Sequence, residues 1–385
     1  MKALYLKRVV RTTASGQEEQ LEFAPGLNII VGEPNTGKTK WLTMIDYVSL
    51  LRDSSVLVEI EINLATNPYI VNGRHWRPST ASKIISLFRF VALLTLINTV
   101  FAGATSPEYG YPDISGLVPD LVCPVLTLDR PAAGKRVRAT LSGFEDSEIY
   151  YSLYLPGNWH PDGHYPVIVE YPGNGRYVSK FGDISTGLVE DCSLGFGLSG
   201  GTNCIWICLP FVDARSRRNA VLWWGDVNAT VAFCKRAVRE VCQKYGGMPT
   251  AVTLCGFSRG AIACNYIGLH DDEIASLWRA FFVSSHYDGV RTWPYADSDR
   301  ASALGRLRRL GSRPVFVSQE VEDIQDTGYS LIDTVNYLCT TGQSLKNFRF
   351  QVVPLRNHSD KWVLYDIPAR RELRAWFKSV LESSP

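Results

Sequence analysis

Residues Gly256–Gly260 read Gly-Phe-Ser-Arg-Gly, with a serine between two glycines. This G-x-S-x-G pattern is typical of a nucleophile elbow, a sharp turn that carries a serine from a strand into a helix. The apolar run Ala251–Cys255 predicts the strand, and the small residues Ala261 and Ala263 predict a closely packed helix. Side chains in place of the two glycines would strike the neighbouring strand and helix. The pattern therefore predicts a nucleophilic Ser258 hydroxyl above a sheet, over a helix N-terminus.

A serine of this kind needs a histidine as general base and an acid that orients the histidine, in the chain order serine, acid, histidine. Of the six histidines, His358 is the one that follows the last predicted strand, residues 347–355, and precedes a final amphipathic helix, residues 368–382. We therefore expect His358 to be the base. For the acid we expect Asp323, just beyond the predicted strand 313–320. The alternatives, left open, are Glu320, Asp326 and, after the preceding strand, Asp288.

The same chemistry needs two N–H donors for the negative oxygen of the reaction intermediate. The first expected donor is the backbone N–H of Arg259, the residue after the serine. The second should come from the turn Pro172–Gly175, which follows an apolar strand. Asn174 is the first choice there and Gly175 the next. This turn resembles the His-Gly-Gly loop of esterases, with Pro172 in place of the histidine.

The segments around these residues alternate between strands and helices. Apolar runs predict strands at 150–157, 165–171, 203–211, 251–255, 279–289, 313–320 and 347–355, with helices at 228–247, after Ser258 and at 368–382. Such alternation predicts an α/β fold with a mostly parallel sheet and helices on both faces.

With these residues in hand, the chain from about 125 to 385 resembles the α/β-hydrolase family, on its secreted esterase side (feruloyl esterases, polyester depolymerases and dienelactone hydrolases). The resemblance implies the α/β-hydrolase fold and a serine hydrolase that cleaves carboxylic esters without a cofactor. Ser258 would attack the ester carbonyl with His358 as base, an acyl-enzyme would form, and His358 would activate the water that releases it. The substrate would be a small-molecule or polysaccharide-linked ester. A serine peptidase of the prolyl-oligopeptidase type shares this fold and triad and is the alternative.

Two aromatic-rich segments, Leu222–Asp226 and Arg291–Asp299, bear on the substrate. They could line a cleft for an aromatic or sugar ester, or they could be ordinary packing at a rim. Both interpretations stay open at this point.

A second motif lies at Gly32–Thr39, where the sequence GEPNTGKT matches every fixed position of a P-loop. Backbone N–H groups next to Gly32 and Gly37 would wrap phosphates, Lys38 would neutralise their charge, and Thr39 would bind Mg²⁺. Together with a hairpin predicted over residues 2–26, this loop makes residues 1–77 resemble the amino-terminal lobe of SMC and recombination-repair ABC ATPases. No convincing Walker B acid or signature loop follows, so nucleotide binding is possible and hydrolysis is not expected. An ATP-binding module with a degenerate hydrolase domain is therefore a further alternative for the chain.

Residues 78–104 combine basic residues, the apolar run Phe90–Val100 and the small-residue end Ala102–Ala104. This combination is typical of a secretory signal peptide, and the run is short for a membrane span. We therefore expect three parts: a truncated P-loop segment (1–77), a signal-like segment (78–104) and a catalytic domain (105–385). The protein would be secreted or periplasmic, or cytoplasmic if the segment is not used. Because a signal peptide belongs at an N-terminus, residues 1–77 are expected to be a remnant or a gene-model fusion.

Charge and cysteines exclude several classes of partner. With 40 basic and 38 acidic residues the net charge is +2, so no global field favours nucleic acid or an anionic membrane, and no stable membrane insertion is expected. The basic cluster Arg306–Arg313 indicates a solvated helix face. No Cys-x-x-Cys or Cys/His spacing resembles a zinc site, so no metal is expected. The oligomeric state is left open.

Overall fold

The computed structural model describes residues 111–179, 181–321 and 330–383, and, before residue 76, only the backbones of short strands. The chain divides into two compact units, Met1–Tyr109 and Gly110–Pro385. The domain boundaries predicted at residues 77 and 104 stay predictions. Among the described residues, no helix combines the length and the apolar character needed to cross a bilayer.

In the first unit, the described residues form three antiparallel strand pairs. They are β2 (Arg8–Thr12) with β3 (Glu18–Glu22), β1 (Leu4–Leu6) with β4 (Ile60–Ile62), and β5 (Ile70–Val71) with β6 (Arg74–His75). Of the hairpin predicted over residues 2–26, the pairing of 8–12 with 18–22 is seen, whereas Leu4–Leu6 pairs with β4 instead. The P-loop residues Gly32, Gly37, Lys38 and Thr39 and the signal-like segment 78–104 lie outside the described residues.

The second unit is built on an eight-stranded sheet in the order β18-β17-β16-β15-β9-β12-β8-β7. Its strands are β7 (Arg136–Ala139), β8 (Tyr151–Tyr154), β9 (Tyr165–Tyr171), β12 (Ile205–Cys208), β15 (Gly247–Phe257), β16 (Ala280–Ser284), β17 (Val315–Glu320) and β18 (Phe348–Val353). Within this sheet β8 runs antiparallel to both of its neighbours, and the pairs from β12 to β18 are parallel. The predicted mostly parallel sheet is confirmed.

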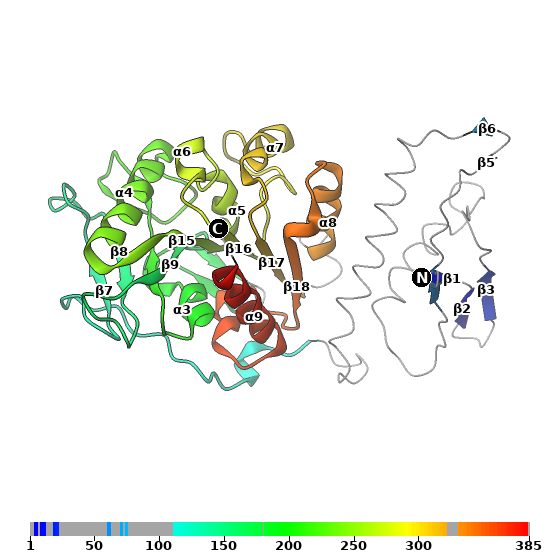
Figure 1. Cartoon of the computed structure of the whole chain (residues 1–385), viewed down its shortest axis with the longest axis horizontal. Coiled ribbons are helices and arrows are strands. Elements are labelled where there is room, and N and C mark those ends of the chain that lie inside the picture. Colours follow the sequence, from blue (N-terminus) through cyan, green and yellow to red (C-terminus); the bar gives the residue numbers. More distant parts are fainter. Residues whose placement is uncertain are drawn as a thin grey trace. The chain divides into compact units, whose positions relative to one another are not determined.

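Helices cover this sheet. They are α3 (Leu194–Ser199), α4 (Val227–Tyr245), α5 (Arg259–Tyr266), α6 (Asp272–Ala275), α7 (Arg300–Leu307), α8 (Leu331–Thr340) and α9 (Pro368–Glu382). In Figure 1, α3 and α9 lie on one side of the sheet and α4, α5 and α8 on the other. Helices α3 and α9 contact each other. Both contribute to one buried cluster with Trp206, Phe282 and Phe316, which are strand residues.

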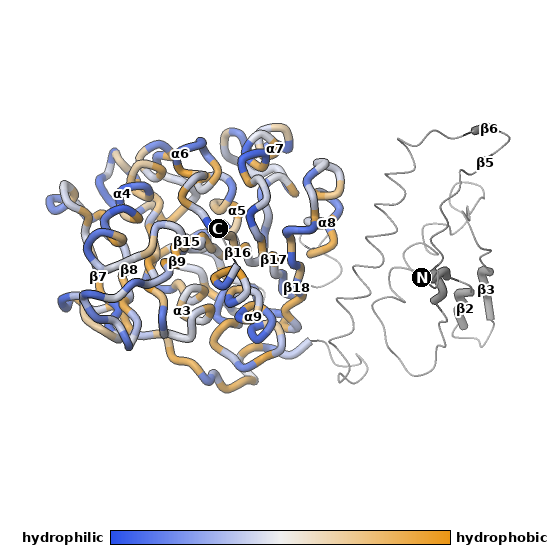
Figure 2. The backbone as a smooth tube through the Cα atoms, in the orientation of Figure 1, coloured by the Kyte–Doolittle hydropathy of each residue, from blue (hydrophilic) through white to orange (hydrophobic). Residues whose placement is uncertain are grey.

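Local sequence explains how α4 is placed. The Asp226 side chain accepts a hydrogen bond from the Ala229 N–H and so caps the start of the helix, and Gly246 ends it in a left-handed conformation. Its buried residues, which include Phe233 and Val238, face the sheet. Figure 2 shows hydrophilic residues on the outer turns of this helix. Two short hairpins, β10 (Tyr177–Val178) with β11 (Ile184–Ser185) and β13 (Phe211–Asp213) with β14 (Arg218–Ala220), stand beside the sheet's carboxyl edge.

The basic cluster is only in part the solvated face that its sequence indicates: Arg308 is exposed, but Arg306 and Arg313 are not. Arg306 is only 8% exposed and donates two hydrogen bonds to the Asp288 carboxylate, at 2.8 and 3.0 Å. The partly buried Arg313 donates to the Trp278 carbonyl at 2.9 Å. The prediction is wrong here because charge spacing along a helix does not reveal which acceptors the rest of the fold brings to it.

Candidate active site

Ser258 lies at a strained turn between β15 and α5. Its backbone has φ 53° and ψ −113°, in the positive-φ region that non-glycine residues rarely adopt. The turn leaves no room for side chains at the flanking glycines. A Cβ on Gly256 would come within 2.1 Å of the Gly260 carbonyl oxygen, and one on Gly260 within 2.0 Å of the Tyr171 carbonyl oxygen. Ser258 is thereby held at the carboxyl end of a central strand, over the first turn of a helix.

His358 lies within hydrogen-bond reach of the serine. Its Nε2 is 3.1 Å from Ser258 Oγ, and its Nδ1 is in hydrogen-bond contact with the Glu320 carboxylate. When Nδ1 carries the proton and donates it to Glu320, Nε2 is left to accept the serine hydroxyl proton. His358 follows β18 and Glu320 ends β17, the neighbouring parallel strand, so both side chains reach the same edge of the sheet.

The Glu320 carboxylate is buried, 7% exposed, and has a second donor. The hydroxyl of Ser285, which follows β16 with φ 82°, donates to its other oxygen. Burial by itself would raise the pKa of Glu320, but the charge of His358 and the hydrogen bonds from His358 and Ser285 hold the pKa below its usual value. The carboxylate is therefore kept ionised beside the imidazole.

Of the other three candidate acids, one lies among the described residues. Asp323 and Asp326 lie outside the described residues. Asp288 is 2% exposed and forms a buried ion pair with Arg306 instead. The carboxylate in contact with Nδ1 is thus that of Glu320, an alternative to the expected Asp323.

The turn after β9 is pinned to its surroundings. The Asn174 side-chain oxygen accepts the Trp223 N–H at 2.8 Å, and the Gly175 N–H donates to the Val221 carbonyl at 2.7 Å. Gly175 is therefore already engaged, whereas the Arg259 N–H lies in the first turn of α5, where helices leave N–H groups without an intrahelical acceptor. Gly173, next to Asn174, lines the cavity beside His358.

The side chain of Arg259 has a role that the sequence motif does not disclose. It is 1% exposed, stacks over the Phe211 ring at 4.2 Å and donates to the carbonyls of Trp223 (2.7 Å) and Gly187 (3.4 Å). Burial lowers the pKa of this arginine to about 9. Arg259 thus ties the elbow to two loops that flank the Pro172–Gly175 turn.

A cavity of about 190 Å³ opens beside His358. Its walls come from the elbow (Phe257), the turn after β9 (Pro172, Gly173), the segment 184–188 that ends the β10–β11 hairpin, and the histidine loop (358–361). Of the carboxylates that line it, Glu170 and Asp360 are buried. Burial and their mutual repulsion raise the pKa of Asp360 to about 8, and burial also raises the pKa of Glu170.

A row of aromatic rings leads away from His358 in another direction. The His286 ring lies 5.4 Å from that of His358 and 5.5 Å from that of Trp293, and Trp293 lies 5.6 Å from Trp223. The structure therefore brings the two aromatic-rich segments together, next to the histidine. Burial and the neighbouring His358 lower the pKa of His286 to about 3, so its imidazole is neutral at physiological pH.

Among the described residues, one group of side chains has the donor atoms for a metal. Ligand atoms of Glu170, Cys192 and Cys208 lie within 4.8 Å of one another, although 22 and 16 positions separate these residues in the sequence. The Glu170 oxygens already accept three N–H groups, from Leu194 (3.1 Å), Gly195 (2.8 Å) and the Trp206 indole (2.8 Å). Burial raises the pKa of both thiols. A carboxylate satisfied in this way, beside protonated thiols, fits a structural role.

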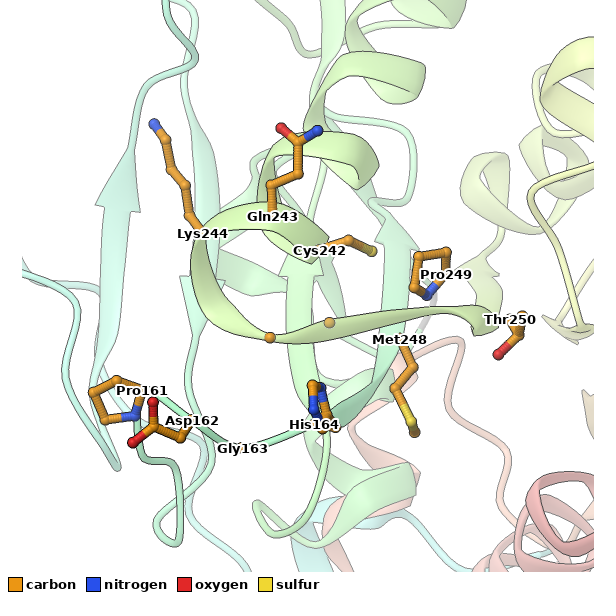
Figure 3. A pocket seen from close by; sticks show the side chains of 12 residues that line it. Pro161, Asp162, Gly163, His164, Cys242, Gln243, Lys244, Met248, Pro249 and Thr250 are labelled. Carbon is orange, nitrogen blue, oxygen red and sulfur yellow. The ribbon is translucent and has the colours of Figure 1, made fainter.

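A second, more open hollow of about 520 Å³ lies far from this chemistry (Figure 3). It is lined by the turn before β9, the end of α4 and the start of β15. It therefore lies at the amino ends of β9 and β15. Ligands of open α/β sheets bind at the carboxyl ends. The smaller cavity, beside His358, is therefore the one that belongs to the candidate site.

Comparison with known proteins leaves the function open. No family model matches the chain, and no curated protein matches it. Similar solved structures include a thermostable esterase (13% identity, TM-score 0.41, covering 63% of this chain and 62% of that one). A ferulic acid esterase is 14% identical, with a TM-score of 0.42, and the match covers 64% of this chain and 97% of that one. TT1662 from Thermus thermophilus is 14% identical, with a TM-score of 0.44, and the match covers 65% of this chain and 99% of that one. The match thus spans less than two thirds of the thermostable esterase.

These likenesses are too slight to carry an argument about activity. What the chain itself has is a mostly parallel sheet with helices on both faces and a strand–turn–helix elbow after β15. This architecture fits the α/β-hydrolase fold. The sequence predicts Ser258, His358 and the backbone N–H groups of Arg259 and Asn174 as site groups. It does not predict the hydrogen bond from Ser285 to Glu320 or the packing of the Arg259 side chain. The one available signal for Ser285 was its position directly after a strand.

Proposed function

We propose that the protein is a serine hydrolase that cleaves carboxylic esters, with Ser258 as nucleophile, His358 as base and Glu320, in place of the expected Asp323, as the acid. The observation that carries this proposal is the hydrogen-bonded series Ser258–His358–Glu320 at a strained elbow. These side chains come from the elbow, the end of β17 and the loop after β18, and they form the hydrogen-bonded series that acyl transfer requires.

The reaction follows from this geometry. Ser258 Oγ attacks the ester carbonyl carbon while His358 Nε2 takes the hydroxyl proton, and Glu320 stabilises the resulting imidazolium. The negative carbonyl oxygen receives hydrogen bonds from the backbone N–H groups of Arg259 and Asn174, each contributing on the order of 3 kcal/mol in the transition state. His358 then gives the proton to the leaving alcohol as the C–O bond breaks. Water, deprotonated by His358, attacks the acyl-enzyme and frees the acid.

Short p-nitrophenyl esters and a fluorophosphonate probe test this proposal. The purified protein should hydrolyse the esters and be labelled at Ser258, and Ser258→Ala should lose both properties. A protein that does neither is not a serine hydrolase, and labelling that survives Ser258→Ala would place the nucleophile elsewhere.

The substrate is proposed to be a small-molecule or polysaccharide-linked ester. The cavity beside His358 would hold one part of it, and the row Trp293–Trp223 offers flat aromatic faces to a ring in the other part. The peptidase alternative shares the same three residues. Turnover of peptide p-nitroanilides at a rate above that of the esters would favour it.

Export and nucleotide binding are proposed on sequence grounds alone. We infer from residues 78–104 a signal peptide, so that the native product would begin near Thr105. N-terminal sequencing that finds a start far from Thr105 would refute export. For the loop Gly32–Thr39, Mg·ATP turnover that is lost in Lys38→Ala would revive the ATP-binding alternative.

A further inference from the structure

Asp183, in the turn of the β10–β11 hairpin, holds the loop that carries the candidate base. Its carboxylate accepts the backbone N–H of His358 at 3.1 Å and the side-chain amide of Asn357 at 3.0 Å. Neither Ser258 nor Glu320 takes part in these contacts. The hairpin thus binds the histidine loop through the backbone of the histidine itself.

The carboxylate is oriented from within its own turn. The Ser179 hydroxyl donates to it at 2.7 Å and accepts the Asp183 N–H at 3.0 Å, while the Ser179 N–H donates to the Asp183 carbonyl at 2.8 Å. A side chain fixed by reciprocal bonds of this kind loses little further entropy when it binds a neighbour. The turn therefore presents a preorganised acceptor to the histidine loop.

Two further contacts join the same two segments. The Arg356 guanidinium lies over the Phe181 ring at 5.0 Å, and the Tyr177 ring meets the His358 imidazole edge-on at 5.3 Å. Residues Arg356, Asn357 and His358 are thus each in contact with the hairpin. On its other side the loop is tied to the start of the domain, because the Asn357 side-chain oxygen accepts the Ile114 N–H at 2.7 Å.

The hairpin also meets the substrate cavity. Ile184 and Ser185 of β11 line the cavity of about 190 Å³ together with His358. The exposed apolar side chains Tyr177 (43%), Val178 (64%) and Ile184 (71%) stand on this hairpin. The β10–β11 hairpin therefore both lines the cavity and binds the backbone of His358.

We propose that Asp183 is a positioning residue for His358, and that through it the β10–β11 hairpin fixes the imidazole between Ser258 and Glu320. The inference rests on the proposed hydrolase function. The distance between Nε2 and the serine oxygen depends on the path of the histidine backbone, which Asp183 anchors. Loss of this anchor moves the base and leaves substrate contacts largely intact.

The test compares Asp183→Ala, Asp183→Asn and Ser179→Ala in the full chain, well below the unfolding temperature. Asp183→Ala should lower kcat for p-nitrophenyl acetate and the rate of fluorophosphonate labelling together, about 10-fold to 100-fold, with KM changed less than about threefold. Asp183→Asn keeps an oxygen acceptor and should recover most of the rate. Asp213→Asn is the matched control, since that carboxylate ends β13 and accepts the Ser216 N–H at 2.9 Å in the turn of the other hairpin; it should leave kcat unchanged.

Folded Asp183→Ala with a kcat within twofold of wild type overturns the proposal, and so does a loss confined to KM. If Asp183→Ala does not fold, wild-type rates in both Asp183→Asn and Ser179→Ala overturn it. Amide hydrogen exchange of the segment 354–360 gives a readout that needs no activity. Its protection should fall in Asp183→Ala, and unchanged protection refutes the anchor. A wild-type protein that resists the fluorophosphonate refutes the hydrolase function itself, which is a different result.

Discussion

At the scale of single residues, the carboxylate that contacts the imidazole of His358 is determined by its position and by the groups that donate hydrogen bonds to it. Glu320 ends β17, and its carboxylate lies between the imidazole of His358 and the hydroxyl of Ser285. Asp288 is equally buried, but its charge is neutralised by Arg306. Two buried carboxylates, one at the end of β17 and one in the segment after β16, thus have separate roles: the first is oriented toward the imidazole and the second belongs to the framework.

Substitution of these two acids should separate those roles. In Glu320→Gln the imidazolium loses its negative partner, so kcat should fall on the order of a thousandfold or more, with little change in the free energy of unfolding. In Asp288→Asn the buried Arg306 loses its partner, so unfolding should become easier by about 3 kcal/mol, with kcat within a few-fold of wild type. Ester kinetics and urea unfolding of both variants measure this. A large kcat loss in Asp288→Asn with a normal Glu320→Gln would reverse the assignment.

At the scale of elements, the elbow depends on how closely α5 approaches the sheet. The first turn of the helix touches the end of β9 so tightly that Gly260 has no room for a methyl group. This contact keeps the serine, the helix N-terminus and the Pro172–Gly175 turn at one place. The glycines of the motif are therefore required by packing, since neither of them has a positive φ.

Gly260→Ala should be strongly destabilising for this reason. Its Cβ would overlap the Tyr171 carbonyl oxygen at 2.0 Å, and we expect a loss of about 3 kcal/mol or more in unfolding free energy, together with lost ester turnover. The matched control is Gly305→Ala in α7, where a Cβ meets nothing within 4 Å. That variant should be neutral or gain about 1 kcal/mol, because alanine favours helix. Equal stability of the two variants would contradict the packing argument.

At the scale of the whole molecule, a buried acid pair links the start of α3 to the histidine loop. Asp360 accepts the Ser193 N–H at 2.8 Å, and Glu170 accepts the N–H groups of Leu194 and Gly195. The two carboxylates are close enough to oppose each other's ionisation. The folded protein therefore favours a protonated Asp360.

This pair should make stability depend on pH. The pKa of Asp360 rises from 3.8 to about 8 on folding, so its stabilising contribution is complete below pH 3.8 and is lost as the pH rises through about 8. We expect the unfolding temperature to fall between pH 5 and pH 9 and to fall less in Asp360→Asn, which resembles the protonated acid. Thermal unfolding at a series of pH values measures this. A decline as steep in Asp360→Asn as in wild type would assign it to other groups.

Some features of this protein were determined by the sequence itself because they are local. Five consecutive residues, Gly256–Gly260, are enough to predict the elbow. Apolar runs that alternate with helical segments are enough to predict a mostly parallel sheet. The position of His358 after the last strand follows from that order.

Other features were decided by tertiary structure because they depend on which loops meet. Several carboxylates lie within a few positions of the end of β17, and the one that contacts Nδ1 is set by where the strand ends relative to the loop after β18. Asp183 reaches the His358 backbone across 175 positions, and no spacing rule connects them. Local chemistry thus selected the serine and the histidine, while packing of distant segments selected their partners.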